Sequence, residues 1–259
     1  MENVINNYTK SPLPVVVEGM TSVSALINSV LSGKNTRRIL QVLVSNEAIK
    51  SKRRETAFLR AKAGVLGYCF SVVPVGEIDG LAEGKTHGGI IALCTERHLP
   101  ALVAENLPEL GFFVLLEGIE DPFNFGYTVR SLYAAGADGI VLGRRNWMSA
   151  ASTVIRASAG TTELIDMYEE DPVKAVNIFK SRGYRIISAG IRDSVSLYEA
   201  DLRLPLLLII GGEKRGISRR LLELSDQIVR IDYGRKFMGS LTTSAAAAVF
   251  AFEIMRRGR

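Results

Sequence analysis

The feature that most constrains the fold is an unbroken apolar run, LLLII, at residues 206–210. It ends at Gly211 and Gly212, and a polar stretch follows at 213–216. A short continuous apolar run is typical of a strand buried on both faces, as in a parallel sheet covered by helices on either side. Two glycines at a strand end let the backbone turn sharply and approach a ligand closely. The run therefore predicts an α/β fold with a ligand site at Gly211.

The chain after this run supports the same interpretation. Ser218 is expected to cap a short helix, and residues 227–231 read as a second buried strand. A glycine-containing loop then leads to Ser240, where an Ala-rich helix is predicted to begin and to run to about Arg256. Because loops at the carboxyl ends of parallel strands meet at one edge of the sheet, where ligands bind, these segments predict a single site.

Alternating apolar patterns upstream predict two α/β units, residues 1–100 and 111–259, joined by a linker at 101–110. In the first unit, a helix capped by Thr21 or Ser22 has a stripe of apolar residues. A second helix at 52–66 is expected to turn Phe58, Ala61 and Val65 inward. The other expected strands are at 15–17, 39–44, 68–73, 89–93, 113–116, 140–142 and 184–188. Three further helices are expected in the second unit: one capped by Asn124, one spanning 148–159 and one capped by Asp171.

The net charge of +5 is concentrated in one segment, because residues 34–62 hold nine basic and two acidic residues. Such a patch predicts contact with a polyanion, such as nucleic acid or a membrane surface. A solvated helix face is the alternative. The candidate RNA-binding residues are Lys34, Arg37, Arg38, Lys52, Arg53 and Arg54.

Several other classes of protein are not favoured. Two cysteines are too few for a disulfide framework, so a cytoplasmic protein is expected. No signal-peptide pattern and no apolar run of about 18 residues is present, so no membrane span is predicted. His87, Cys94 and His98 lack the paired spacing of a metal site, and no metal is predicted.

The residues after the apolar run also exclude familiar nucleotide and hydrolase motifs. GGEKRG lacks the order of a P-loop, and no Gly-x-Gly-x-x-Gly opens the second unit. The only histidines, His87 and His98, lie outside that unit, which argues against a histidine-based triad there. The remaining candidates are glycines, hydroxyls, Glu213 and the polar loop at 124–130.

Three ordered motifs follow predicted strands of the second unit. The first is N-x-G-x-x-x-R at Asn124, Gly126 and Arg130, and the second is GGEKRGIS at 211–218. The third is Ile231 followed by Ser240 and Leu241. Together these motifs resemble the SpoU, or TrmH, family of RNA 2′-O-ribose methyltransferases. The first 100 residues, with the His87-Gly88-Gly89 turn before a strand, resemble the ribosomal-protein-like RNA-binding domain that many members carry.

The resemblance implies a C-terminal knotted, SPOUT-type parallel-sheet domain in which the chain between Gly211 and Leu241 threads a loop. It also implies a homodimer and S-adenosylmethionine held by backbone groups of the knot. The residues expected at this cofactor are Gly211, Ile231, Leu241, Gly212, Gly216, Ser188, Ala189, Gly190 and Thr242.

The resemblance also assigns the catalytic candidates. Methyl transfer to a hydroxyl depends strongly on positioning. Arginine is a poor base because its guanidinium group holds its proton firmly, so we expect Arg130 to bind phosphate and stabilise developing alkoxide charge. Asn124 would orient the hydroxyl or Arg130, Glu213 would brace the loop, and Ser240 would bond near the substrate. A helix cap for Asn124 and a surface ion pair for Arg130 remain the alternatives.

The chain departs from the family pattern after Ile231. Asp232 and Tyr233 replace the usual Pro and Met, the spacing to Ser240 is about one residue longer, and Thr242 replaces asparagine. The leading hypothesis is S-adenosylmethionine-dependent 2′-O-methylation of a ribose in structured rRNA or tRNA. The alternatives are a non-catalytic RNA-binding or ribosome-assembly factor and a methyltransferase with another acceptor. The sequence names neither the RNA, the nucleotide nor a link to antibiotic resistance.

Overall fold

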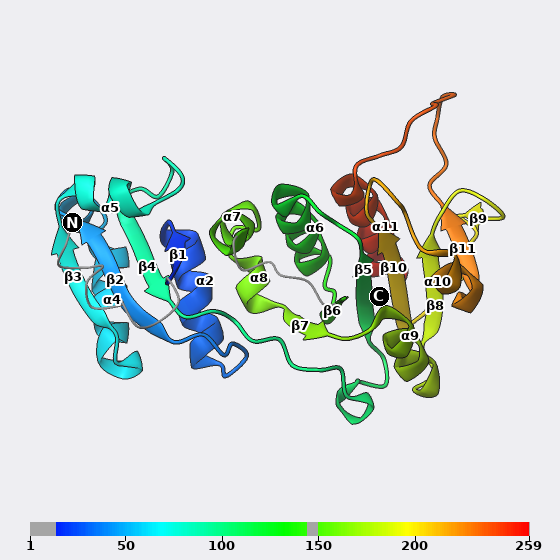
Figure 1. Ribbon diagram of the computed structural model, residues 1–259, viewed down its shortest axis with the longest axis horizontal. Coiled ribbons are helices and arrows are strands. Elements are labelled where there is room, and N and C mark those ends of the chain that lie inside the picture. The colour runs from blue at the N-terminus through cyan, green and yellow to red at the C-terminus, as the bar shows by residue number, and fades with distance from the viewer. Residues whose placement is uncertain (1–13, 144–149, 259) are drawn as a thin grey trace. The chain divides into compact units, whose positions relative to one another are not determined.

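The computed structural model describes residues 14–143 and 150–258 (Figure 1). The chain divides into two compact units, described separately below. Unit 1 comprises the residues up to 98 together with 147–164, and unit 2 comprises 99–146 and 165–259. Residues 150–164 fall within the range 111–259 that the sequence assigns to the second domain, yet they group with unit 1.

Unit 1 is built on a four-stranded sheet in the order β1-β4-β2-β3. The strand β4 runs antiparallel to both β1 and β2, whereas β2 and β3 are parallel. The elements are β1 (Val15–Glu18), α2 (Met20–Leu31), β2 (Ile39–Ser45), α3 (Ala48–Ser51), α4 (Arg53–Leu66), β3 (Cys69–Val73), α5 (Val75–Leu81) and β4 (Ile90–Cys94). The four strands predicted in this part of the chain are all present.

The two long helices of unit 1 differ in how well the sequence predicted their buried faces. Helix α2 buries Leu26 and Ile27 completely, as its apolar stripe predicted, although Gly19 occupies its N-cap position and not Thr21 or Ser22. For α4 the prediction holds for Phe58, which packs against the core, and is wrong for Ala61 and Val65, which are exposed. The buried face of α4 carries Thr56 and Leu59, with Ala63 and Leu66 packed beside them, at the three- and four-residue spacing of one helix face.

Two helices complete unit 1, and they come from between the strands β6 (Gly139–Leu142) and β7 (Asp166–Glu169) of unit 2. They are α7 (Ala151–Ala157) and α8 (Thr161–Leu164); the predicted start of α7 at Met148 lies outside the described residues. Ile155 of α7 belongs to the apolar core of unit 1. A buried ion pair also joins Arg37 Nε to Glu163 Oε2 at 2.8 Å. These contacts explain why the segment groups with unit 1.

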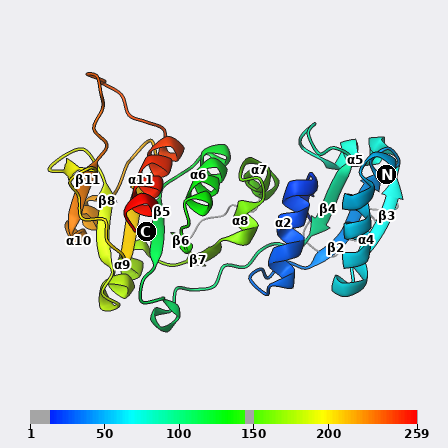
Figure 2. The ribbon, with the colours of Figure 1, turned by 180° about the vertical axis from the view of Figure 1, so that it is seen from behind.

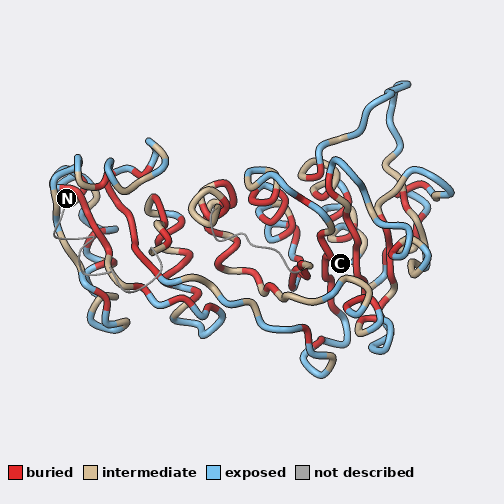
Figure 3. Tube along the Cα trace, in the orientation of Figure 1, coloured by how far each residue is buried: buried red, intermediate tan, exposed pale blue. Residues whose placement is uncertain are grey.

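Unit 2 contains a seven-stranded sheet in the order β7-β6-β5-β10-β8-β11-β9, and every neighbouring pair of strands is parallel. The predicted parallel α/β sheet is therefore confirmed. The strands are β5 (Phe112–Glu117), β6 (Gly139–Leu142), β7 (Asp166–Glu169), β8 (Arg185–Ala189), β9 (Val195–Ser196), β10 (Leu206–Gly211) and β11 (Gln227–Arg230). The LLLII run forms most of β10, beside β5, and is fully buried (Figure 3).

Helices cover both faces of this sheet (Figures 1 and 2). Helices α9 (Pro172–Ser181) and α10 (Arg219–Leu224) pack on each other, and their Phe179 and Leu221 share a core with alternate residues of β10. Helices α6 (Pro122–Ala134) and α11 (Thr243–Arg257) pack against each other on the opposite face. A short 3₁₀ helix, η2 (Ala104–Asn106), lies in the segment before β5.

Helix caps fix where three of these helices begin. Asp171 accepts a hydrogen bond from the Lys174 amide at 2.9 Å, with Pro172 in the first turn, as predicted for α9. In α6 the predicted cap is wrong, because Asp121 accepts from the Asn124 amide at 2.7 Å and Asn124 lies inside the first turn. Thr242 caps α11 by accepting from the amide of Ala245 at 3.3 Å.

The described helices include none with the length and apolar character needed to cross a bilayer.

Candidate active site

A cavity of about 380 Å³ lies at the carboxyl edge of the sheet of unit 2, where ligands bind in parallel α/β folds. Its walls come from the ends of β8, β10 and β11 and from the start of α11. We call it the carboxyl-edge cavity. The predicted residues that line it are Ala189, Gly190, Gly211, Gly212, Glu213, Gly216, Ile231, Ser240 and Leu241.

The glycines of the second motif are required by close approach of the backbone. A Cβ atom on Gly212 would lie 2.1 Å from the carbonyl oxygen of Gly118, and one on Gly211 would lie 2.3 Å from the carbonyl carbon of Gly216. Gly216 also has a φ of +63°, which side chains of L-residues rarely allow. The glycine loop thus folds back onto the end of β10 and against the loop after β5.

Polar contacts tie this glycine loop to the first motif. Asn124 Nδ2 donates to Glu213 Oε1 at 2.7 Å, so Asn124 contacts the second motif directly. The Lys214 ammonium pairs with Glu120 at 2.6 Å. The Ser218 amide donates to the Glu117 carboxylate at 2.8 Å. These contacts support the predicted bracing position of Glu213 and place the first two motifs side by side.

The third motif and the start of α11 form one wall of the carboxyl-edge cavity. Thr243 Oγ1 donates to the carbonyl oxygen of Gly211 at 3.3 Å, which ties the helix start to the end of β10. The Tyr233 hydroxyl accepts from the Leu241 amide, also at 3.3 Å. Both Thr243 and Tyr233 line the cavity. The Thr243 hydroxyl was among the hydroxyl candidates from the sequence, whereas Tyr233 was noted only as a departure from the family pattern.

Two residues predicted at the cofactor lie elsewhere. The Ser188 side chain is buried against Ser225, with 2.7 Å between their hydroxyl oxygens. Thr242 serves as the helix cap, and neither residue lines the carboxyl-edge cavity. Residues that the prediction missed are neighbours of motif residues or alternate positions along the same strands. Besides Tyr233 they are Ile191, Arg192, Ile217, Leu222, Ile228, Val229, Arg230, Ala246 and Phe250.

Arg130 is exposed on α6 and does not line the carboxyl-edge cavity. Within the described part of the chain, no carboxylate forms an ion pair with it. Arg130 shares a helix face with Phe123 and Tyr127, at positions i, i+4 and i+7, and both aromatic side chains are exposed. The four predicted catalytic residues therefore lie in two places. Glu213 and Ser240 line the cavity, and Asn124 is joined to it through Glu213. Arg130 lies on the exposed face of α6.

The cavity has the features of a small-molecule site. Its volume lies toward the small end of the range for ligand pockets, about 300–1,000 Å³. Its apolar side chains, among them Ile231 and Leu241, suit an adenine ring, and the exposed backbone of the glycine loop offers polar groups. The closely packed glycines bring the backbone of this loop to the wall of the cavity. These residues fit S-adenosylmethionine.

Residues 111–252 match the SpoU rRNA Methylase family over more than half of the chain. The chain belongs to this family. The family predicted from three ordered motifs is thereby confirmed, and with it S-adenosylmethionine-dependent methylation of RNA.

Relatives from several bacteria are similar over nearly the whole chain. The 23S rRNA (guanosine-2′-O-)-methyltransferase RlmB of Shewanella oneidensis is 26% identical and covers 94% of this chain and 98% of its own. The SpoU methyltransferase AviRb of Streptomyces viridochromogenes, solved with AdoMet, aligns with a TM-score of 0.77 and 19% identity, covering 98% of this chain and 94% of its own. An AdoMet-bound rRNA methyltransferase of Sinorhizobium meliloti gives a TM-score of 0.76 at 20% identity, with 94% and 87% covered. The two structural matches support the fold.

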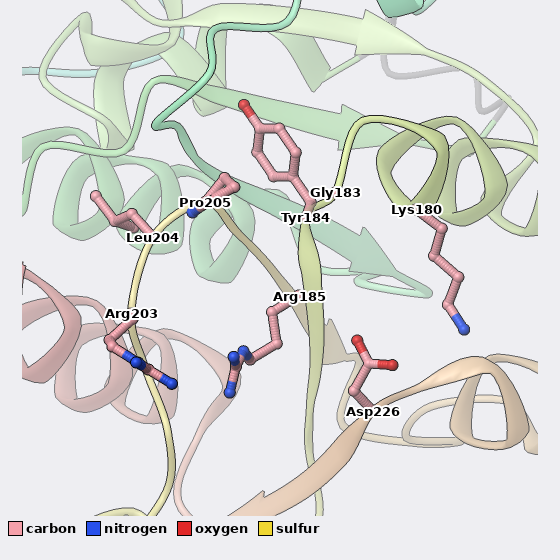
Figure 4. Close-up of a pocket in the computed structure, with 8 residues that line it drawn as sticks. All are labelled: Lys180, Gly183, Tyr184, Arg185, Arg203, Leu204, Pro205 and Asp226. Carbon is pink, nitrogen blue, oxygen red and sulfur yellow. The ribbon is translucent and has the colours of Figure 1, made fainter.

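A second cavity in unit 2, of about 690 Å³, lies at the amino edge of the same sheet (Figure 4). Arg185 and Arg203 both bind the Asp201 carboxylate. The hydrogen bond from Arg203 is the largest of the effects that hold the pKa of this carboxyl group well below its usual range. Asp226 accepts from the Ile186 amide at 2.8 Å. The Asp201 and Asp226 carboxylates are already hydrogen-bonded within the chain, and ligands of parallel α/β sheets bind at the opposite, carboxyl edge. This cavity is therefore the weaker candidate for the active site.

The basic segment of unit 1 is partly exposed and partly structural. Lys34, Arg38, Arg53 and Arg54 are exposed. Arg37 corrects the prediction, because it is buried and paired with Glu163, which makes it inaccessible to RNA. The remaining candidate, Lys52, is half-buried and donates to the carbonyl oxygen of Gly88 at 2.8 Å.

The three residues tested as metal ligands do not form a cluster. His87 sits in the predicted turn, where its Nδ1 accepts from the Gly89 amide at 3.1 Å and its Nε2 lies 3.0 Å from Asp79. Burial raises the pKa of the Cys94 thiol to about 12, and this thiol donates to the carbonyl oxygen of Val15. Among residues 14–143 and 150–258, no group of three potential ligands is suitably placed for a metal ion.

Proposed function

We propose that the protein methylates the 2′-hydroxyl of a ribose in ribosomal RNA, in the cytoplasm, at the carboxyl-edge cavity of unit 2. The observation that carries this proposal is that the second and third motifs line one cavity, to which Asn124 of the first motif is tied through Glu213. Ribosomal RNA is favoured because the relative from Shewanella oneidensis is named as a 23S rRNA 2′-O-methyltransferase.

In this site S-adenosylmethionine supplies an electrophilic methyl group bound to a positively charged sulfur. The chain's own contribution is to position and polarise the acceptor. The Asn124–Glu213 contact ties together the two loops that border the cavity. Ser240, at the exposed end of the cavity, can hydrogen-bond near the ribose. Apolar side chains such as Ile217 and Phe250 limit access of water.

Arg130 is assigned to the RNA and not to a base role. Its guanidinium carries a permanent charge and five donors, which suits a phosphate or a developing alkoxide. It lies on the exposed face of α6 beside Phe123 and Tyr127. The packed partner helix α11 adds exposed Val249 and Phe252. A homodimer formed through this apolar α6–α11 face would bury these side chains and bring Arg130 to the subunit boundary.

The knot predicted from the family is supported by the order of the strands. Strand β10 lies between β5 and β8, and β11 lies on the far side of β8. The chain nevertheless returns after β11 so that α11 contacts β10 and α6. We infer that this return passes through the loop formed by the preceding segment, which would fix the loops around the carboxyl-edge cavity.

Unit 1 is assigned to RNA binding. Arg38, Arg53 and Arg54 are exposed cations without an ion pair among the described residues, so their charges are available to phosphates. Binding should therefore weaken steeply with salt. The buried Arg37 is excluded from this surface.

The deciding experiment is isothermal titration with S-adenosylmethionine, followed by transfer of a tritiated methyl group to ribosomal RNA. Wild type should bind, whereas Ile231→Trp, which fills the cavity, should not. Arg130→Ala should keep cofactor binding and lower methyl transfer by about 100-fold or more, as expected for loss of transition-state charge stabilisation.

Two outcomes would contradict the proposal. Near-wild-type turnover by Arg130→Ala would remove Arg130 from the mechanism. A folded wild-type protein that ignores millimolar S-adenosylmethionine yet binds RNA would favour the non-catalytic RNA-binding alternative.

A further inference from the structure

The segment between β11 and α11 presents large apolar side chains to solvent. Met238 is 91% exposed and Phe237 is 56% exposed. This segment, residues 233–241, projects from unit 2 in Figure 1 as the orange loop between β11 and α11. We call it the aromatic loop. It is also where the sequence departs from its family, with Asp232 and Tyr233 replacing Pro and Met.

The aromatic loop has a defined internal structure. At its base, the Asp232 carboxylate accepts from Arg230 Nε at 2.8 Å and from the Ser196 hydroxyl. At its closure, the Tyr233 hydroxyl accepts from the Leu241 amide. The rings of Tyr233 and Phe237 meet edge to face, with centroids 5.5 Å apart. Because both ends of the loop are anchored and Phe237 packs on Tyr233, the loop loses little conformational entropy when Phe237 contacts a ligand.

The aromatic loop borders the carboxyl-edge cavity directly. Tyr233, Ser240 and Leu241 line that cavity, and Phe237 packs on Tyr233. The exposed ring of Phe237 is thus one side chain removed from the cavity wall. Any RNA that brings a ribose to the cavity must pass close to this loop.

The loop also carries two exposed cations, Arg235 and Lys236. Neither forms an ion pair within the part of the chain that the structure describes. The acidic residue at the base, Asp232, is already paired with Arg230. The aromatic loop therefore combines an apolar, polarisable tip with a net charge of +2 from these two side chains.

This combination matches the way proteins hold unpaired nucleotides, in which bases stack on exposed rings and cations track the phosphates. We propose that Phe237 and Met238 stack against an unpaired base next to the methylated ribose, while Arg235 and Lys236 hold its phosphates. The thioether of Met238 suits contact with an aromatic base. The inference rests on the RNA methylation proposed above and adds a specificity-determining surface to it.

Charge favours RNA over a second copy of the chain as the occupant. The chain has a net charge of +5, and two aromatic loops meeting across a symmetric interface would bring Arg235 and Lys236 into proximity with like charges. A polyanion is attracted by the same residues. The apolar α6–α11 face, in contrast, offers an interface in which these cations do not take part.

The test uses a fluorescein-labelled 15-nucleotide oligouridylate, which has no stable secondary structure, and measures its affinity by fluorescence anisotropy. Phe237→Ala should weaken binding by about 5- to 150-fold, the range for loss of one base stacked on an aromatic ring. Met238→Ala should weaken binding by about 2- to 10-fold, the range for loss of a sulfur–aromatic contact. Phe237→Trp should retain affinity because its ring can still stack. Tyr198→Ala, at another exposed aromatic position in unit 2, is the matched control and should bind as wild type does.

Salt dependence separates the two kinds of contact. Arg235→Ala and Lys236→Ala should each lower the slope of log affinity against log salt concentration by about 0.7, the value per phosphate of a single strand. Met238→Ala should leave that slope unchanged. All variants should bind S-adenosylmethionine as wild type does, and KM for ribosomal RNA should rise with the loss of oligouridylate affinity.

The possible results distinguish failure of the inference from failure of the proposed function. Unchanged oligouridylate affinity and unchanged KM in Met238→Ala and Phe237→Ala, with an active wild type, would overturn the stacking role. Conversion of the Met238→Ala protein from dimer to monomer in sedimentation would also overturn it, by assigning the aromatic loop to a subunit contact. A wild type that neither binds nor methylates RNA would contradict the proposed function, and this inference with it.

Discussion

The two units hold distant parts of the chain together in different ways. In unit 1, the segment that carries α7 and α8 is fixed by buried charges, because Glu163 binds Arg37 at 2.8 Å and Asn35 at 2.6 Å. In unit 2, the loops around the carboxyl-edge cavity are joined by exposed polar contacts, such as Asn124 with Glu213, and by close backbone approach at glycines.

This difference matters for what each unit can do. A buried charge that loses its partner is strongly unfavourable, so the network at Glu163 enforces one arrangement. Exposed contacts contribute little individually and let loops adjust around a ligand. We infer that unit 1 is built as a rigid binding unit and that the loops of unit 2 are shaped mainly by glycine packing.

The largest expected effect comes from breaking the buried network. Glu163→Ala leaves the Arg37 guanidinium buried without its main partner, which should lower the free energy of unfolding by about 3–5 kcal/mol. Urea unfolding followed by circular dichroism would measure this loss. The matched control is Glu223→Ala, which removes an exposed i,i+4 pair with Arg219 and should cost at most about 0.5 kcal/mol.

A double variant sharpens this test. Arg37→Met combined with Glu163→Leu removes both charges together and should recover most of the stability lost in Glu163→Ala. If Glu163→Ala itself unfolds at the wild-type urea concentration, the buried pair does not hold α8 in place, and the contrast drawn between the two units is wrong.

The second expected effect is local to unit 2. Gly212→Ala would place a Cβ atom 2.1 Å from the Gly118 carbonyl oxygen, so the loops after β5 and β10 must separate. Affinity for S-adenosylmethionine should fall by about 10-fold or more, equivalent to about 1.4 kcal/mol, as measured by isothermal titration. Gly64→Ala, inside α4 where nothing lies within 4 Å, should bind the cofactor normally and gain about 0.5–1 kcal/mol of stability. Equal affinities of the two variants would exclude glycine packing as the feature that shapes the cavity.

Much of the fold was predictable because the information was local. The apolar runs of β5 and β10 specify buried parallel strands, and the Asp171-Pro172 pair specifies the start of α9. The missed elements, such as the two-residue strand β9 and the four-residue helix α8, are too short to have a periodic pattern. The assignment of α7 and α8 to unit 1 depends on contacts across more than 100 residues, which no local window contains.

The same division applies to the predicted site residues. The glycines and Ile231 were recognised from ordered motifs. The glycine positions are especially recognisable, because few residue types other than glycine allow two backbone segments to approach so closely. Arg37 was misassigned because its charge suggested a surface position, whereas its partner Glu163 lies 126 residues away. Tyr233 was noted only as a departure from the family, since its bond to the Leu241 amide depends on how the aromatic loop closes.

The smallest expected effect tests a charge cluster at the end of α11, in which Arg256 is exposed and Glu253 and Arg257 are half-buried. Hydrogen bonds from Arg256 and then Arg257 lower the pKa of Glu253 to about 2, below the ordinary value of about 4.3. A depressed carboxyl pKa contributes stability that is present above pH 4.3 and is lost as the pH falls toward 2. Because Arg256 is largely exposed, the contribution should be only about 0.5–1 kcal/mol.

Thermal unfolding of Glu253→Gln and wild type across pH 2–7 measures this contribution. The difference in midpoint should be constant above about pH 5 and should shrink steadily below pH 4.3, because the wild-type carboxylate becomes protonated and then resembles the variant. A difference that stays constant down to pH 2 would mean that the ion pairs contribute nothing and that only packing was changed. A loss as large as that expected for Glu163→Ala would contradict the distinction between buried charges in unit 1 and weak exposed pairs in unit 2.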